Sequence, residues 1–116
     1  MVNTGINPAR VDIDIWQGAT FKTTVDFDQG DFTGYGARMQ IRKDETSENP
    51  LVALTHLDSI AIDALNAKVT VTVPASITET LTATNAVYDL FLDKPGGDVV
   101  KILFGQVTIH KAITRD

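Results

Sequence analysis

The sequence predicts an all-β domain, an immunoglobulin-like antiparallel β-sandwich of seven to nine strands with one short helical turn. Apolar and polar residues alternate through most of the chain, which is the period of a strand that buries one face. Turn signals rich in Gly, Pro and Asp separate the alternating segments at intervals of about 8 to 15 residues. No long segment has the 3.6-residue period of an amphipathic helix, so two packed β-sheets are favoured.

Residues 11–15 form the first predicted strand, because every second side chain from Val11 onward is apolar. The same alternation continues through residues 21–27 and 37–42. Gly105 interrupts the last strand and predicts a β-bulge there. The remaining strands are predicted at residues 51–57, 60–62, 68–73, 87–93 and 98–110, and the last two are separated by the Lys94-Pro95-Gly96-Gly97 turn.

One short helical turn is predicted at residues 75–81. Ser76 and Glu79 have the spacing of a capping box, in which the serine caps the helix and the glutamate bonds back to it. Ile77 and Leu81 lie four residues apart, so one turn of helix would place both toward the core. This turn would carry the chain from one sheet to the other.

The chain has 116 residues, the size of one ordinary domain. The absence of cysteine excludes disulfides, cysteine-bound metals and thiol nucleophiles, and it is compatible with synthesis in a reducing cytoplasm. We divide the chain into an N-terminal arm (1–10), the sandwich (11–111) and a C-terminal tail (112–116).

Charge and hydropathy argue against nucleic-acid and membrane partners. The formal net charge is −5, and the Lys and Arg residues are scattered, with Arg38, Arg42 and Lys43 the densest group. We interpret that group as one solvated strand face, because nucleic-acid binding depends on clustered phosphate contacts. No segment approaches the roughly 18 consecutive apolar residues of a membrane span, and the N-terminus does not read as a signal peptide.

The sequence predicts no catalytic, cofactor-binding or metal-binding residues. His56 and His110 lie in predicted strands without a nucleophile motif and are interpreted as surface or strand-end histidines. Asp12 and Asp14 share one strand face, where carboxylates are usually solvated. Asp26, Asp28 and Asp31 cluster around one turn, but no downstream bidentate glutamate completes a calcium loop, so a polar turn is favoured.

Three stretches carry a family resemblance. They are Ile15-Trp16-Gln17-Gly18-Ala19-Thr20-Phe21, Asp31-Phe32-Thr33-Gly34-Tyr35-Gly36-Ala37-Arg38-Met39-Gln40-Ile41-Arg42, and Val87-Tyr88-Asp89-Leu90-Phe91-Leu92 with the later Gly105-Gln106-Val107-Thr108-Ile109. Their order resembles small structural proteins of tailed bacteriophages and prophages, and is similar to the virion-facing N-terminal domain of phage baseplate upper proteins. Phe32 stands where that pattern usually has Leu, which keeps an apolar side chain.

The resemblance implies an immunoglobulin-like sandwich placed on a phage particle, but it does not imply which part of the particle. We expect a non-enzymatic virion protein, made in the host cytoplasm, that docks to other virion structural proteins, and we favour the tail, baseplate or fibre-attachment region. Multiple copies are expected in the particle, assembled through edge strands and the N-terminal arm. Two alternatives stay open: a capsid decoration (cement) protein on the phage head, and a module that binds a carbohydrate or receptor on the host surface.

The predicted contact elements are the arm and the first strand, together with two aromatic residues. Trp16 is interpreted either as packing in the core or at the sandwich edge, or as a docking anchor. Tyr88, near the start of a late strand, has the position of the tyrosine corner of Greek-key sandwiches, whose hydroxyl folds back to the backbone. Tyr35 would cover one end of the sandwich. The candidate interaction residues are Val11, Ile13, Ile15, Trp16 and Tyr35.

Overall fold

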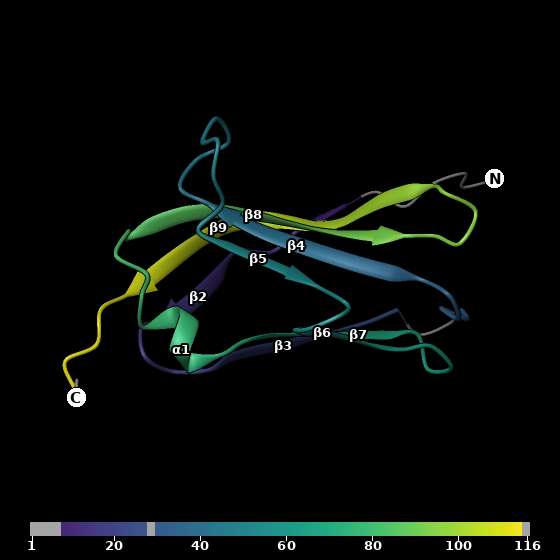
Figure 1. Cartoon of the computed structure of the whole chain (residues 1–116), viewed down its shortest axis with the longest axis horizontal. Coiled ribbons are helices and arrows are strands. Elements are labelled where there is room, and N and C mark those ends of the chain that lie inside the picture. The colour runs from purple at the N-terminus through teal and green to yellow at the C-terminus, as the bar shows by residue number, and fades with distance from the viewer. Residues whose placement is uncertain (1–7, 28–29, 115–116) are drawn as a thin grey trace.

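The chain is an all-β sandwich of two sheets packed face to face, as seen in a computed structural model that describes residues 8–27 and 30–114 (Figure 1). The large sheet has the strand order β1-β9-β8-β4-β5, with β2 also paired to β9, and the small sheet has the order β3-β7-β6. The large sheet consists of β1 (Ala9–Arg10), β2 (Ile13–Trp16), β9 (Val99–His110), β8 (Asn85–Asp93), β4 (Gly36–Arg42) and β5 (Val52–Thr55). The small sheet consists of β3 (Phe21–Asp26), β7 (Lys68–Val73) and β6 (Ile60–Asp63).

The core lies between the two sheets and follows the alternation in the sequence. Val69, Val71 and Val73 of β7 are at most 1% exposed, while their neighbours along the strand point outward. Leu90 and Leu92 of β8 oppose them from the large sheet. These residues are buried because each strand presents one face to the other sheet, and this part of the fold prediction is confirmed.

The prediction of a purely antiparallel sandwich is wrong at the N-terminus. β1 and β2 both run parallel to β9, with Ile13 opposite Val107 and Ile15 opposite Ile109. The large sheet therefore contains both parallel and antiparallel strand pairs, because β1 and β2 lie beside β9 and run in the same direction. The described part of the arm is also ordered: Ala9 and Arg10 pair with Leu103 and Phe104, so the sheet begins before the predicted boundary at residue 11. Residues 1–7 and 115–116 lie outside the described residues.

The first predicted strand is broken at Val11 and Asp12, where the backbone crosses close to β9. A Cβ atom on Gly105 would lie 2.4 Å from the carbonyl oxygen of Val11, so only glycine permits this approach. The Val11 N–H donates to the Phe104 carbonyl at 2.8 Å, and the Gln106 N–H donates to Asp12 Oδ1 at 2.9 Å. Gly105 thus marks a close backbone approach and not the predicted bulge.

The register irregularity of the last hairpin lies three residues earlier than Gly105. Leu90 pairs with Leu103 and Phe91 pairs with Lys101, so Ile102 is the extra residue. This is the two-against-one arrangement of a β-bulge, and it bends the long β9 strand before it reaches β1.

Tyr88 uses its hydroxyl over a much longer span than a tyrosine corner does. It donates to the Val11 carbonyl at 2.5 Å, between residues 77 apart in the sequence. A tyrosine corner bonds to the backbone a few residues upstream, so the sequence prediction is corrected: Tyr88 ties the N-terminal crossing to the centre of the large sheet. Burial, with a smaller contribution from the charge of Asp12, raises the pKa of Tyr88 to about 12.

The helix α1 (Ala75–Thr78) begins one residue before the predicted cap. Pro74 occupies the N-cap position and no side chain caps the helix, so the capping box at Ser76 and Glu79 does not form. The reason is that proline fixes φ and initiates the turn by itself. Leu81 is buried as expected, and Ile77 packs on the core. None of the helices in the described residues is long and apolar enough to cross a membrane.

Thr78, the last residue of α1, connects the two sheets. It is fully buried, donates to the Ala19 carbonyl at 2.9 Å and accepts from the Gly18 N–H at 3.0 Å. Gln17 adds a bond from its amide to the Leu81 carbonyl at 2.9 Å. The link between β2 and β3 is therefore held by side chains from α1 and its neighbourhood.

The opposite end of the sandwich is closed by three aromatic rings. Phe32 stacks on Tyr35 at 4.8 Å between ring centroids and meets Phe27 edge-on at 5.0 Å. Phe32 is buried, and Phe27 and Tyr35 are half-buried against the core. Tyr35 therefore covers this end, as the turn sequence predicted.

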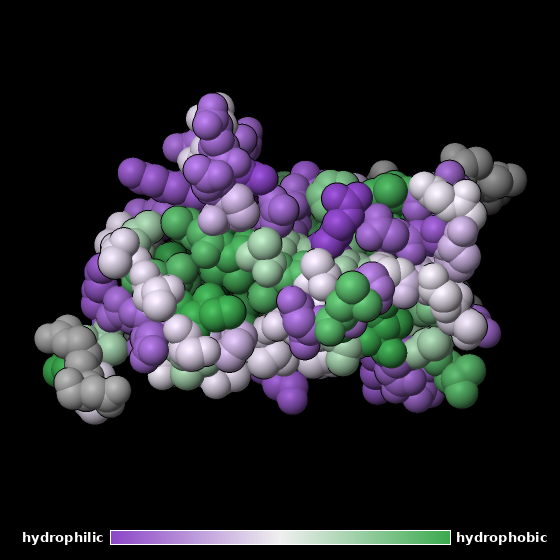
Figure 2. Space-filling view, viewed as in Figure 1, coloured by the Kyte–Doolittle hydropathy of each residue, from purple (hydrophilic) through white to green (hydrophobic). Residues whose placement is uncertain are grey.

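The two sheets leave apolar surface accessible along the margin where β5 leads into β6. Figure 2 shows this apolar surface in the middle of the molecule, below the polar projection formed by the loop between β4 and β5. Leu51, before β5, is 39% exposed, and Leu57, in the turn before β6, is 84% exposed. The margin is less tightly covered than the centre of the core.

Candidate protein-docking surface

The outward face of the large sheet carries an aromatic corner at the ends of β2 and β9. Trp16 and His110 are cross-strand neighbours, and their rings stack with centroids 3.9 Å apart and planes 15° apart. His110 Nε2 lies 2.9 Å from Asp14 Oδ1. Trp16 remains 59% exposed. We call Asp14, Trp16 and His110 the aromatic corner.

The stacked geometry suits the aromatic corner to contact with another surface. One face of the indole is already held by the imidazole, so the ring loses little conformational freedom when a partner covers it. Exposed Trp side chains of this kind supply a large part of the binding energy in protein interfaces. A core position for Trp16 is excluded by its exposure, whereas packing at the sandwich edge on His110 and a docking-anchor role are both compatible with it.

The centre of the same face is a ladder of charged and aromatic side chains. Arg38 Nε donates to both carboxylate oxygens of Asp93, at 3.3 and 3.2 Å, and its guanidinium lies 5.2 Å from the Phe91 ring. Lys101 pairs with Asp89 at 3.5 Å and lies over the same phenyl ring. These partly exposed pairs contribute little to stability, but they fix the positions of the side chains.

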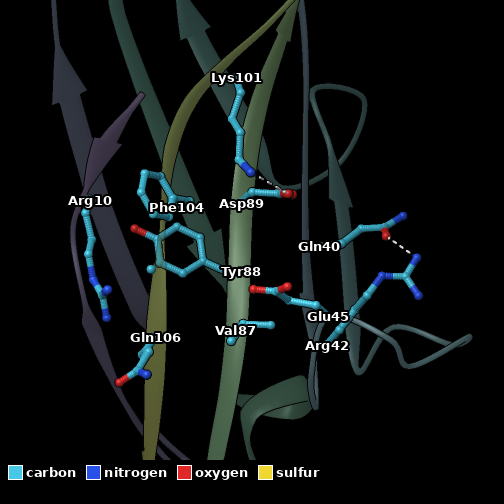
Figure 3. Close-up of a pocket in the computed structure, with 11 residues that line it drawn as sticks. Arg10, Gln40, Arg42, Glu45, Val87, Tyr88, Asp89, Lys101, Phe104 and Gln106 are labelled. Atoms are coloured by element: carbon cyan, nitrogen blue, oxygen red, sulfur yellow. Dashed lines mark hydrogen bonds and ion pairs between the residues drawn. The ribbon is translucent and has the colours of Figure 1, made fainter. Parts of the chain in front are cut away.

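A groove of about 440 Å³ lies beside this ladder (Figure 3). Arg10 and Phe104 lie on one side of it, and Arg42 and Glu45 on the other (Figure 3). The groove is lined by Arg10, Gln40, Arg42, Glu45, Val87, Tyr88, Asp89, Lys101, Phe104, Gly105 and Gln106.

Arg42 shapes the wall of the groove by holding the loop between β4 and β5. Its Nη1 donates to the carbonyls of Ser47 and Glu48 at 2.7 and 2.9 Å, and its Nη2 donates to Gln40 Oε1 at 2.6 Å. Asp44 organises the start of this loop by accepting from Thr46, and these hydrogen bonds lower the pKa of the Asp44 carboxyl. The loop therefore stands above the sheet in a defined conformation.

The structure distributes the five sequence-predicted interaction residues over different environments. Trp16 and Val11 are 59% and 44% exposed on the β1–β2 segment. Ile13 is half-buried, and Ile15 is fully buried between the sheets. Ile15 therefore belongs to the core and is corrected as a contact residue, because a side chain without exposed surface cannot touch a partner. Tyr35 lies in the aromatic end cluster, away from the other four.

The two histidines hold structural positions at strand ends. His56 follows β5, and its Nδ1 accepts from the Ala37 N–H at 3.2 Å. His110 is the last residue of β9 and belongs to the aromatic corner. Neither histidine lies against a nucleophilic side chain in the contacts of the described residues.

The aspartates that the sequence analysis weighed as candidate sites have separate hydrogen-bond partners. Asp12 accepts from the Gln106 N–H, which is the main reason that its pKa is lowered, and it also pairs with Arg10 at 3.2 Å. Asp31 accepts from Thr33, and this lowers the pKa of Asp31. Asp28 lies outside the described residues, and within residues 8–27 and 30–114 no cluster of three potential metal ligands forms.

Sequence reasoning did not find the groove. Arg38, Gln40 and Arg42 alternate with core residues in the sequence, which predicted their outward face correctly. Their neighbours Phe104 and Arg10 come from the other end of the sheet through β8, β9 and β1. A single sequence has no signal for that proximity, because it depends on the order of the strands.

No family model matches the chain, and no curated protein matches it.

Proposed function

We propose that this chain is a non-enzymatic bacteriophage virion protein, an immunoglobulin-like docking module of the tail, baseplate or fibre-attachment region. The observation that carries the docking role is the exposed Trp16, stacked on His110 at the rim of the large sheet. A large, pre-oriented aromatic ring of this kind is typical of interface hot spots. The placement in a virion depends on the resemblance of the sequence motifs.

The strand order supports the immunoglobulin-like part of the proposal. The small sheet has the order β3-β7-β6, which corresponds to B-E-D when the strands from β3 onward are lettered B, C, C′, D, E, F and G. The large sheet then has the order G-F-C-C′ from β9 to β5. These are the neighbour relations of the two sheets in immunoglobulin domains that carry an additional C′ strand.

The mechanism of docking would be the addition of a rigid surface to a larger assembly. The outward face of the large sheet supplies the aromatic corner, fixed ion pairs and the groove, which are built on strands except for the groove wall formed by the loop between β4 and β5. Such a surface loses little entropy on binding. The predicted contribution of the N-terminal arm concerns residues that lie mainly outside the described part of the chain, so it stays a prediction.

The test is a Trp16→Ala substitution in a phage that encodes this chain. We expect the amount of the protein in purified particles, measured by quantitative mass spectrometry, to fall about tenfold or more, because removing a hot-spot Trp typically costs about 2 kcal/mol or more. Leu65→Ala is the control, since Leu65 is also an exposed apolar residue, 81% exposed in the turn between β6 and β7. Unchanged incorporation of the Trp16→Ala protein would refute the role of the aromatic corner.

The same measurement separates the alternative locations. A copy number that follows the symmetry of the tail supports the proposal, whereas a copy number in proportion to the major capsid protein favours capsid decoration. A host-surface carbohydrate module also needs exposed aromatic rings, and Trp16 would be its natural platform. Binding of the wild-type protein on a glycan array, lost in Trp16→Ala, would favour that alternative.

A further inference from the structure

The outer edge of β3 has a self-complementary sequence. β3 pairs with β7 on one side, and within the small sheet of the described residues its other side has no neighbour (Figure 1). The segment reads Phe21-Lys22-Thr23-Thr24-Val25-Asp26-Phe27. Reading outward from Thr24 in both directions gives a Thr–Val pair, a Lys–Asp pair and a Phe–Phe pair.

The main-chain groups of alternate β3 residues point away from the small sheet. The Thr72 N–H donates to the Ser59 carbonyl beside β6, whereas the Phe27 N–H donates to the Ala67 carbonyl beside β7. Neighbouring residues of a strand direct their N–H and C=O groups to opposite sides. The main-chain groups of Val69, Val71 and Val73 therefore point toward β3. On β3 itself, the main-chain groups of Lys22, Thr24 and Asp26 point away from β7. This edge can accept the hydrogen bonds of an added strand.

The core side of β3 is incompletely covered. Phe21, Thr23 and Val25 are half-buried although they face the interior, and Phe27 beyond them is also half-buried. Their partners on β7 are at most 1% exposed. A strand added beside β3 would cover the apolar atoms that remain accessible at this margin.

We propose that β3 pairs with β3 of a second copy of this chain, antiparallel and centred on Thr24, so that the two small sheets become one continuous sheet. In this register Lys22 lies opposite Asp26 of the other copy, twice by symmetry, and Phe21 lies opposite Phe27. Oppositely charged and aromatic cross-strand pairs both stabilise a sheet. A two-fold arrangement requires such a self-complementary surface.

The other edges of the sandwich do not have this property. β2 carries Asp14 and follows Asp12, so two copies would bring like charges together. β5 has no charged residue, and β6 ends in Asp63 without a cationic residue of its own to oppose it. Of β2, β3, β5 and β6, β3 is the strand whose charges match their own copy.

The experiment is sedimentation velocity on the full chain at concentrations up to about 1 mM. The wild type is expected to dimerise reversibly. Lys22→Asp creates two repulsions with Asp26 and should raise the dissociation constant about tenfold, and the double variant Lys22→Asp with Asp26→Lys should restore it to within about threefold. Thr24→Pro removes an outward N–H from the edge and should abolish the dimer without unfolding the domain.

Asp63→Lys is the matched control. Asp26 on β3 and Asp63 on β6 both lie opposite Lys68 of β7, but Asp63 is on the other edge of the small sheet. It should leave the dissociation constant unchanged, and circular dichroism of each variant checks the fold. A wild type that sediments as a monomer throughout, or a Lys22→Asp dimer that the second substitution does not rescue, would overturn the proposal. The result is independent of Trp16, whose substitution should not affect this dimer.

Discussion

The two margins of the sandwich are held in different ways. At the margin where β1 and β2 meet β9, hydrogen bonds join residues far apart in the sequence, such as Tyr88 to Val11 and Gln106 to Asp12, 77 and 94 residues apart. At the margin where β5 leads into β6, the side-chain bonds have a shorter range: the Thr55 N–H donates to Asp58, three residues away, and the Ala37 N–H donates to His56 Nδ1, 19 residues away. The first margin therefore depends more on bonds between distant parts of the chain, and the second depends more on local turns.

This difference has a consequence for stability. A bond between distant residues exists only when the whole fold has formed, so removing it lowers the free energy of unfolding of the domain. A turn bond between near neighbours also forms in part in the unfolded chain, and its removal changes stability less. The following substitutions test this comparison, in order of decreasing expected effect.

Gly105→Ala should have the largest effect. The added Cβ atom would lie 2.4 Å from the Val11 carbonyl oxygen, so the N-terminal crossing must move away from β9. We expect the free energy of unfolding to fall by about 3 kcal/mol, which urea denaturation measures. Gly96→Ala is the control, because no atom lies within 4 Å of its added Cβ and its φ is not positive. Equal stability of the two variants would contradict the close approach.

Tyr88→Phe should have an intermediate effect, with a distinctive pH dependence. Loss of the bond to the Val11 carbonyl should lower the free energy of unfolding by about 1 kcal/mol at neutral pH. The pKa of Tyr88 is raised from its usual value of 10.0 to about 12, so the folded state favours the neutral phenol. This contribution is complete below pH 10 and is lost as the pH rises from about 10 toward about 12.

Unfolding of the wild type should therefore become easier across that alkaline range, and Tyr88→Phe should lack this part of the slope. Denaturant titrations between pH 8 and the alkaline limit measure it. Tyr35→Phe removes the other tyrosine hydroxyl of the chain and is the matched control, which should keep the slope due to Tyr88. An identical alkaline profile of wild type and Tyr88→Phe would show that the Tyr88 hydroxyl is not held as described.

The smallest changes in stability are expected for substitutions of Asp12 and Asp58, one aspartate at each margin. The pKa values of Asp12 and Asp58 are both lowered, chiefly by backbone hydrogen bonds from Gln106 and Thr55 respectively. Each ionised carboxylate therefore stabilises the fold above the usual aspartate pKa of 3.8, and this contribution is lost as the pH falls through the lowered value. We expect Asp12→Asn to lower the urea midpoint at pH 7 more than Asp58→Asn does. A larger loss in Asp58→Asn would reverse the comparison of the margins.

The position of Trp16 shows how far the sequence could predict the candidate site. The alternation placed Trp16 on the same strand face as Asp12 and Asp14, opposite Ile15, but the sequence left packing in the core or at the edge and a docking role open. The stacking partner His110 could not be foreseen, since it depends on the parallel pairing of β2 with β9. The groove was missed for the same reason, because Arg42 and Arg10 come from strands that are far apart in the chain.

The sequence by itself determined which residues of each strand face the core, where the turns lie and that the domain is a β-sandwich. Period-two alternation depends only on neighbouring residues, and the sequence shows it directly at Val69, Val71 and Val73. Only the tertiary structure decided that β1 and β2 run parallel to β9, that Gly105 admits the Val11 carbonyl and that Tyr88 bonds across 77 residues. Alternation fixes the side to which a residue points but not the neighbour that it meets, because strand pairing joins segments that are distant in sequence.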